Sequence, residues 1–113
     1  TPTSAASRKQ MYTTYCAVCH GTDGRGNGPA ANAMKTQPTD LTMLATNNGG
    51  HFPDTHIVTV LQFGVETAAH GSQEMPIWGR AFRSIAQGSA SPASQEHQRI
   101  ANLTDYLKSL QQQ

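Results

Sequence analysis

The segment Cys16-Ala17-Val18-Cys19-His20 decides how the rest of this 113-residue chain is interpreted. It holds both cysteines of the chain, and a histidine directly follows the second one. At the end of a helix, two thiols at this spacing can each add across a vinyl group of one haem, and the adjacent imidazole can then bind the iron. The pattern therefore predicts one covalently bound haem c, attached through Cys16 and Cys19, with His20 as an axial ligand.

The sequence of the segment is also compatible with three other functions. A redox-active cysteine pair would be expected near a strand-helix-strand unit, and no such unit is indicated in this sequence. A zinc site would need a fourth ligand, and the adjacent Cys19 and His20 would chelate one ion awkwardly. A structural disulfide between Cys16 and Cys19 is also possible, but it gives His20 no role.

The second axial ligand of such an iron must come from another methionine or histidine of the chain. Met75 is favoured because Pro76 restricts it to an extended backbone and Gly79 closes the turn, which places it on a stiff loop. His70, on the same loop, is the second choice. Methionines on expected helix faces are more often core residues than ligands. The full set of candidates is Met11, Met34, Met43, Met75, His51, His56, His70 and His97.

The composition indicates a chain that is short of core-forming side chains. Leu, Ile, Val and Phe together make up 17 residues, or 15% of the sequence. This fraction lies below the ~20% at which disorder becomes a concern, although a net charge of +1 argues against disorder. We therefore expect a large cofactor to supply part of the core.

Composition also excludes some classes of protein. The most apolar run, residues 57–65, contains Thr59, Gln62 and Gly64 and is too short to span a membrane. The few scattered Lys and Arg residues form no phosphate-binding stripe, so we expect no nucleic-acid partner. The first residues lack the basic start and apolar stretch of a signal peptide, which fits a processed chain or a cytosolic one.

The hydrophobic pattern predicts an all-α fold with long loops. The segments expected to be helical are a first helix capped by Ser4 and ending towards Tyr15, one or two turns over 29–34, a short helix after the turn at 38–42, a helix over 54–63, and a last helix from about Ser94 to Gln111. The β-branched residues of 54–63 would also suit a strand. The segments expected to be loops are 21–29, 47–50, 64–79 and the Ser-rich connector 88–94.

These features resemble class I monohaem c-type cytochromes, the soluble cytochromes c of bacteria. The similarity takes in the first helix, Cys16 to His20, the Gly-rich loop with Pro29, the Met75-Pro76 pair and the last helix. It implies a cytochrome c fold, in which three to five helices wrap around one covalently bound haem. It also implies one domain over residues 1–113.

The resemblance implies a role for each matching residue. Cys16 and Cys19 would form the thioether links, His20 would be the proximal ligand and Met75 the distal ligand. The Pro29 carbonyl would accept a hydrogen bond from the second ring nitrogen of His20. Further residues are expected at the haem pocket or its propionates, although ordinary core or surface roles stay open for them: Met34, Trp78, Phe82, Arg80 and His51.

In this family the first and last helices cross tightly, with an aromatic residue from each. Tyr12 and Tyr106 match that arrangement. Eight residues before Cys16, however, the family usually has a small residue, whereas this chain has Arg8. Either the helices cross further apart, or Arg8 lies outward and the register is shifted.

The resemblance implies a diffusible electron carrier rather than an enzyme. One alternative is a haem subunit of a larger oxidoreductase. Another is a peroxidase or gas-binding protein in which Met75 dissociates from the iron.

The expected partners are redox proteins, such as a dehydrogenase, a cytochrome complex or a terminal oxidase or reductase. The chain itself is expected to be a monomer or to form transient complexes with them. Lys9, Lys35 and Lys108 are well separated in sequence, so steering by charge should be modest. Binding would then use a small uncharged patch, for which Ala17, Val18 and Ile77 are candidates, although packing on the haem is an equally open role for all three. Haem attachment of this kind implies the periplasm, with a signal peptide already removed.

Overall fold

The computed structural model describes residues 7–33, 38–64, 77–85 and 91–112 of the chain. These ranges contain helices and turns and no β-strand, which confirms the all-α prediction. The five α-helices are α1 (Arg8–Tyr15), α2 (Ala17–His20), α3 (Asp54–Phe63), α4 (Trp78–Ile85) and α5 (Pro92–Ser109). Three short 3-10 helices lie between α2 and α3: η1 (Ala31–Ala33), η2 (Leu41–Met43) and η3 (Thr46–Asn48).

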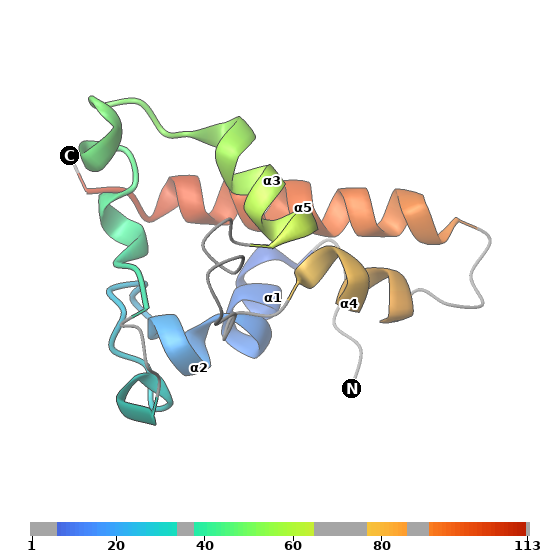
Figure 1. The fold of residues 1–113 in the computed structure, drawn as a ribbon, viewed down its shortest axis with the longest axis horizontal. Coiled ribbons are helices and arrows are strands. Elements are labelled where there is room, and N and C mark those ends of the chain that lie inside the picture. The colour runs from blue at the N-terminus through green and yellow to red at the C-terminus, as the bar shows by residue number, and fades with distance from the viewer. Residues whose placement is uncertain (1–6, 34–37, 65–76, 86–90, 113) are drawn as a thin grey trace.

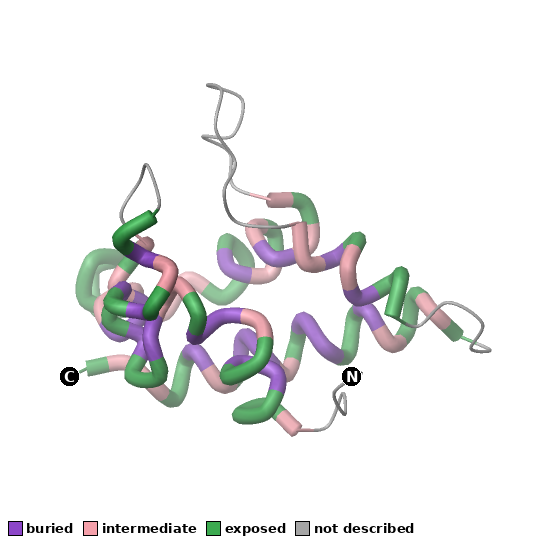
Figure 2. Tube along the Cα trace, turned by 90° about the horizontal axis from the view of Figure 1, so that it is seen from below, coloured by how far each residue is buried: buried purple, intermediate pink, exposed green. Residues whose placement is uncertain are grey.

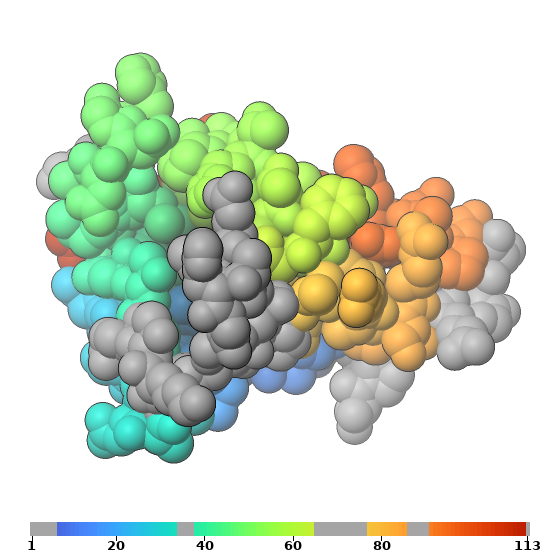
Figure 3. Space-filling view, in the orientation of Figure 1, coloured from blue at the N-terminus to red at the C-terminus, as the bar shows by residue number. Residues whose placement is uncertain are grey.

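Helix α5 is the central helix against which the other long helices pack. It runs along the long axis of the molecule and contacts α1, α3 and α4 (Figure 1). Helices α3 and α4 lie side by side on the face shown in Figure 3. Within the described ranges, no helix combines the length and the apolarity needed to cross a membrane.

The inward face of α5 explains why the helix forms where it does. Ile100, Leu103 and Leu107 recur at helical spacing and are all buried. In Figure 2 the buried stretches of the helices face the interior, while the exposed stretches lie on the outside. Leu110, predicted on the same face, is the C-cap residue and is only half-buried.

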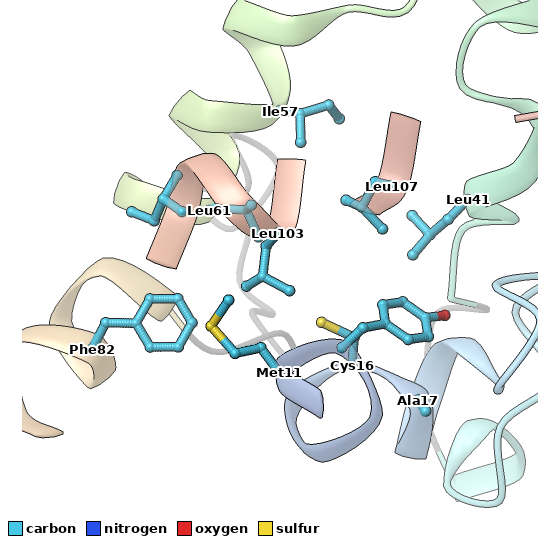
Figure 4. Close-up of a cluster of buried hydrophobic side chains, with 11 residues drawn as sticks. Met11, Cys16, Ala17, Leu41, Ile57, Leu61, Phe82, Leu103 and Leu107 are labelled. Carbon is cyan, nitrogen blue, oxygen red and sulfur yellow. The ribbon is translucent and has the colours of Figure 1, made fainter. Parts of the chain in front are cut away.

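The remaining core side chains come from every α-helix. Figure 4 shows Met11, Cys16, Phe82 and Leu103 pointing toward a common centre. Met11, Phe82 and Leu103 are each 0% exposed. The complete burial of Met11 agrees with the interpretation of helix-face methionines as core residues. That the chain forms one domain over residues 1–113 stays a prediction.

The crossing of α1 and α5 has the aromatic pair that the sequence predicts. The ring centroids of Tyr12 and Tyr106 lie 5.1 Å apart, at an interplanar angle of 40°. Arg8, the first residue of α1, is exposed to solvent. Of the two explanations for its departure from the family pattern, the structure supports the one in which Arg8 lies outward.

Helix α4 was not predicted: its first two residues were assigned to a loop over 64–79, and no element was assigned to the others. The structure begins α4 at Trp78, with Gly79 buried as its second residue. A side chain at Gly79 would collide with the backbone carbonyl of Gln62 and come close to the carboxylate of Glu96. The glycine therefore marks a close approach of α4 to α3 and α5 and does not close a turn.

The ends of the other elements differ from prediction in smaller ways. Helix α1 begins at Arg8 with Ser7 as its N-cap residue, while Ser4 lies outside the described residues. Helix α5 begins at Pro92, so the last part of the expected 88–94 connector is helical. Proline suits this first position, since its missing N–H would have no partner there. Helix α3 has the predicted bounds.

Candidate functional site

Both cysteines lie at the junction of α1 and α2. Cys16 ends α1, and the backbone N–H of His20 donates to the Cys16 carbonyl at 2.9 Å. The two thiols therefore flank one helical turn. Both are free: Cys16 is buried and Cys19 is half-buried. Burial, and secondarily the neighbouring Cys19, raises the pKa of the Cys16 thiol to about 12.

The ring of His20 is oriented by a hydrogen bond to backbone. Its Nδ1 lies 2.9 Å from the carbonyl oxygen of Thr39. A carbonyl oxygen only accepts, so Nδ1 carries the proton and Nε2 keeps its lone pair. Burial lowers the pKa of His20, and the Thr39 carbonyl acts in the opposite direction. The neutral imidazole is the form that binds a metal.

The expected hydrogen bond from His20 to the Pro29 carbonyl was therefore wrong. The residues on either side of Pro29 are bonded to the backbone of α2: Gly28 N–H donates to the Cys19 carbonyl at 3.0 Å, and Ala30 N–H to the Val18 carbonyl at 2.8 Å. Pro29 is thereby held against α2 and is itself exposed. Thr39 provides the carbonyl instead. Any other role of Pro29 beside a haem stays a prediction.

The turn that presents the Thr39 carbonyl is fixed by its neighbours. The Asp40 carboxylate accepts from the backbone N–H of Thr42 at 3.0 Å and from its hydroxyl at 2.6 Å, which caps η2. The Thr42 hydroxyl bond lowers the pKa of Asp40. Leu41 N–H donates to the Gly24 carbonyl, which joins this turn to the glycine-rich loop.

Gly26 shows why that loop needs glycine. Its φ is +90°, in the left-handed region, and a Cβ there would collide with the Pro38 carbonyl. The backbone of the loop can therefore lie directly against the turn that carries Thr39. Sequence reasoning missed Thr39, and the Asp40 cap beside it is the feature that could have pointed to this turn.

Tyr12 connects the helix crossing to the glycine-rich loop. Its hydroxyl donates a buried 2.6 Å hydrogen bond to the Gly21 carbonyl, directly after His20. Burial raises the pKa of Tyr12 above its ordinary value, and the neighbouring ionisable groups of Cys16, Tyr106 and Asp23 act in the same direction. The aromatic pair thus also anchors the residue that follows the histidine.

An aromatic cluster lies beside the Cys16–His20 segment, which we call the attachment segment because haem attachment is expected there. The ring of Tyr15, next to Cys16 in sequence, has its centroid 5.3 Å from that of Trp78 and 5.2 Å from that of Phe82. Trp78 and Phe82 are 5.8 Å apart and stacked. The structure thus brings the predicted pocket residues Trp78 and Phe82 together near Cys16. Tyr15 was missed, although an aromatic residue adjoining the first cysteine was visible in the sequence.

The other predicted site residues are less closely associated with this region. Arg80 and His51 are exposed, and contact with haem propionates stays a prediction for both. Ala17 is buried in the core cluster, so its assignment to a surface patch was wrong, whereas Val18 is 50% exposed. Met34, Met75, His70 and Lys35 lie outside the described residues.

The donor set fits haem c. Two free thiols lie on either side of one helical turn, and the next residue is an imidazole whose Nε2 is free to bind iron. Aromatic and aliphatic side chains around Cys16 provide the apolar surroundings that a flat, largely apolar cofactor requires.

Comparison with known proteins agrees with this chemistry. The family model described as Cytochrome c matches residues 5–111, which include both cysteines, His20 and all five α-helices. Searches of curated proteins and of solved structures gave no significant match. Because the family model covers nearly the whole chain, this protein belongs to the cytochrome c family, whose members bind haem and generally act in electron transfer.

Proposed function

We propose that the protein is a one-electron carrier with haem c attached through Cys16 and Cys19 and bound axially by His20 and Met75. The observation that carries this proposal is the 2.9 Å hydrogen bond between His20 Nδ1 and the Thr39 carbonyl. It leaves Nε2 as the free donor atom at the end of the segment with both thiols. When bound, haem supplies a reversible one-electron change between ferric and ferrous iron.

The protein contributes rigidity and an apolar environment. The Thr39 carbonyl holds the His20 ring in one orientation and makes it a better donor. Tyr15, Trp78 and Phe82 provide apolar aromatic surface beside the attachment segment. Methionine ligation and apolar burial both favour ferrous iron, so we expect a positive reduction potential.

The Met75 assignment is tested by the absorption spectrum of the oxidised protein. We expect the weak long-wavelength band that is characteristic of methionine bound to ferric haem. Met75→Ala should abolish this band, and Met43→Leu, which changes a half-buried methionine of η2, should retain it. A parent protein without the band at neutral pH would contradict the simple carrier and favour a protein that binds small ligands at the iron.

We propose that redox partners dock transiently on an uncharged surface that includes Val18. This side chain is 50% exposed in the turn between the two cysteines. Lys9 and Lys108 are both exposed, but they lie on different helices, α1 and α5. Electron transfer from the reduced protein to an isolated terminal oxidase should therefore vary little with ionic strength and slow down in Val18→Glu. A steep salt dependence would indicate charge-steered docking instead.

We propose a periplasmic location for the mature chain. The proposal follows from the proposed thioether links, because bacteria carry out this attachment on the outer side of the inner membrane. Fractionation of the source cells should recover the haem-containing protein with the periplasmic contents. Recovery of the haem-loaded protein from the cytosol would contradict the proposal.

A further inference from the structure

Helix α5 buries a carboxylate that takes no part in the proposed attachment or ligation of haem. Glu96 is 6% exposed. Its Oε1 accepts a 2.8 Å hydrogen bond from Nε of Arg83 on α4, and the Arg83 side chain is 60% exposed. A carboxylate buried without a partner is costly, so this bond constrains where α4 can lie against α5.

Glu96 also contacts α4 at a second point. A Cβ added at Gly79 would lie 2.8 Å from Glu96 Oε2, so this oxygen abuts the first turn of the helix. The backbone N–H groups of a first turn have no partner within the helix, and negative charge is favourable there. One carboxylate therefore contacts α4 near its start and, through Arg83, near its end. Two such contacts fix the rotation of a helix as well as its distance.

One turn further along α5, a buried arginine contacts an aromatic side chain of α4. Arg99 is 4% exposed, and its guanidinium carbon lies 5.9 Å from the centroid of the Phe82 ring. Phe82 in turn contacts Tyr15 and Trp78. Glu96 and Arg99 are three residues apart and lie on one face of α5. This face therefore contacts the first turn of α4 through Glu96 and the aromatic ring of Phe82 through Arg99.

We propose that Glu96 is a positioning residue that, through Arg83 and the first turn of α4, sets the placement of Trp78 and Phe82 beside the attachment segment. The part of this inference that concerns haem rests on the proposed function. Removing the carboxylate lets α4 rotate or move away from α5. The two aromatic rings then change position, and the environment of the haem changes with them.

Trp78 is the only tryptophan of the chain, so it reports on α4 directly. In the holoprotein we expect Glu96→Ala to raise Trp78 fluorescence, because quenching by haem falls steeply with distance. We also expect a shifted reduction potential and a weaker Soret circular dichroism band. Glu96→Gln should restore part of each property, since its amide oxygen can still accept from Arg83. Asp105→Ala removes an exposed carboxylate from the same helix and should change none of them.

A second variant guards against loss of folding. If Glu96→Ala does not accumulate as holoprotein, Arg83→Gln removes the same contact from its exposed side and should move the three properties in the same direction. The proposal is overturned if the folded variants lose thermal stability alone, with Trp78 emission, potential and Soret dichroism like those of the parent. If the parent itself carries no covalent haem, the proposed function fails. The near-ultraviolet dichroism of Trp78 in the same variants then still tests whether Glu96 positions α4.

Discussion

The loop, which comprises residues 21–33 and 38–43, and the helical frame of α1, α3, α4 and α5 are held in place by different interactions. In the loop, backbone groups bond to backbone groups: Gly28 to Cys19, Ala30 to Val18 and Leu41 to Gly24. In the frame, buried side chains pack against one another around α5. The loop therefore places the atoms that orient His20, and the frame supplies the apolar surroundings of the site.

Hydrogen bonds from the side chains of Tyr12 and Gln111 connect these regions. The Tyr12 hydroxyl bonds to the Gly21 carbonyl at the start of the loop. Gln111, just after α5, donates to the Leu41 carbonyl at 2.7 Å and accepts from Ala45 N–H at 2.8 Å. The frame therefore holds the loop at both ends. We expect substitutions in the loop to affect the orientation of His20, and substitutions in the frame to affect the apolar surroundings of the site.

The largest expected effect comes from removing the cofactor that we propose the two regions hold together. In the double variant Cys16→Ala, Cys19→Ala we expect a largely unfolded chain, because only 15% of the sequence is Leu, Ile, Val or Phe. Far-ultraviolet circular dichroism measures the loss of helix. Near-native helix content in this variant would show that the frame folds without its cofactor.

Within the frame, Leu103→Ala should be the most damaging single substitution. Leu103 is 0% exposed at the centre of α5. Cavities of this kind cost about 2–5 kcal/mol. Urea unfolding of the holoprotein measures the loss, with the half-buried Leu110→Ala as the milder control. Equal losses for the two variants would mean that the core is not centred on Leu103.

Tyr12→Phe tests the connection between the regions. The change keeps the aromatic ring beside Tyr106 and leaves the buried Gly21 carbonyl without its hydroxyl partner. The expected loss of stability is about 1–3 kcal/mol. Tyr106→Phe is the matched control, because it keeps both rings and the Tyr12 hydroxyl. If the two variants unfold at the same urea concentration, the bond from Tyr12 to Gly21 does not stabilise the loop.

The smallest effect is expected in the loop, at the cap that holds Thr39 in place. Asp40→Ala removes both bonds to Thr42, and the loss of such a cap costs about 1 kcal/mol. The folded state lowers the pKa of Asp40. The carboxylate therefore stabilises the fold fully above its unfolded pKa of about 3.9, and this contribution is lost as the pH falls through the lower folded pKa.

Unfolding measured across this pH range checks the prediction. The difference in stability between the parent and Asp40→Ala should be constant near neutral pH and shrink in acid. Asp40→Asn keeps an acceptor oxygen without the charge, so it should retain part of the stability and lose the dependence on pH. A difference that grows in acid would contradict the assigned direction of the pKa shift.

The sequence predicted what depends on local pattern. The spacing of Cys16, Cys19 and His20 singled out the segment that we propose binds haem, and helical periodicity predicted the observed bounds of α3. Helix α4 was missed because Gly79 was interpreted as a loop residue. In the structure, Gly79 is a helix residue that lies in close contact with Gln62 and Glu96.

The partner of His20 was assigned wrongly for a related reason. It is a backbone carbonyl, and every residue carries one, so only the fold selects Thr39 over Pro29. The buried pair of Glu96 and Arg83 likewise joins two helices that are separate in sequence. Residues whose role depends on contacts between distant elements could not be predicted, because local spacing carries no information about those contacts.

The central claim is that haem is bound covalently through the Cys16–His20 segment. Acid–acetone treatment of the purified holoprotein, followed by mass spectrometry of its proteolytic peptides, tests this claim most directly. We predict that the haem stays with the polypeptide and that the peptide containing both Cys16 and Cys19 gains the mass of one haem. Haem recovered in the organic phase, with that peptide unmodified, would contradict the claim.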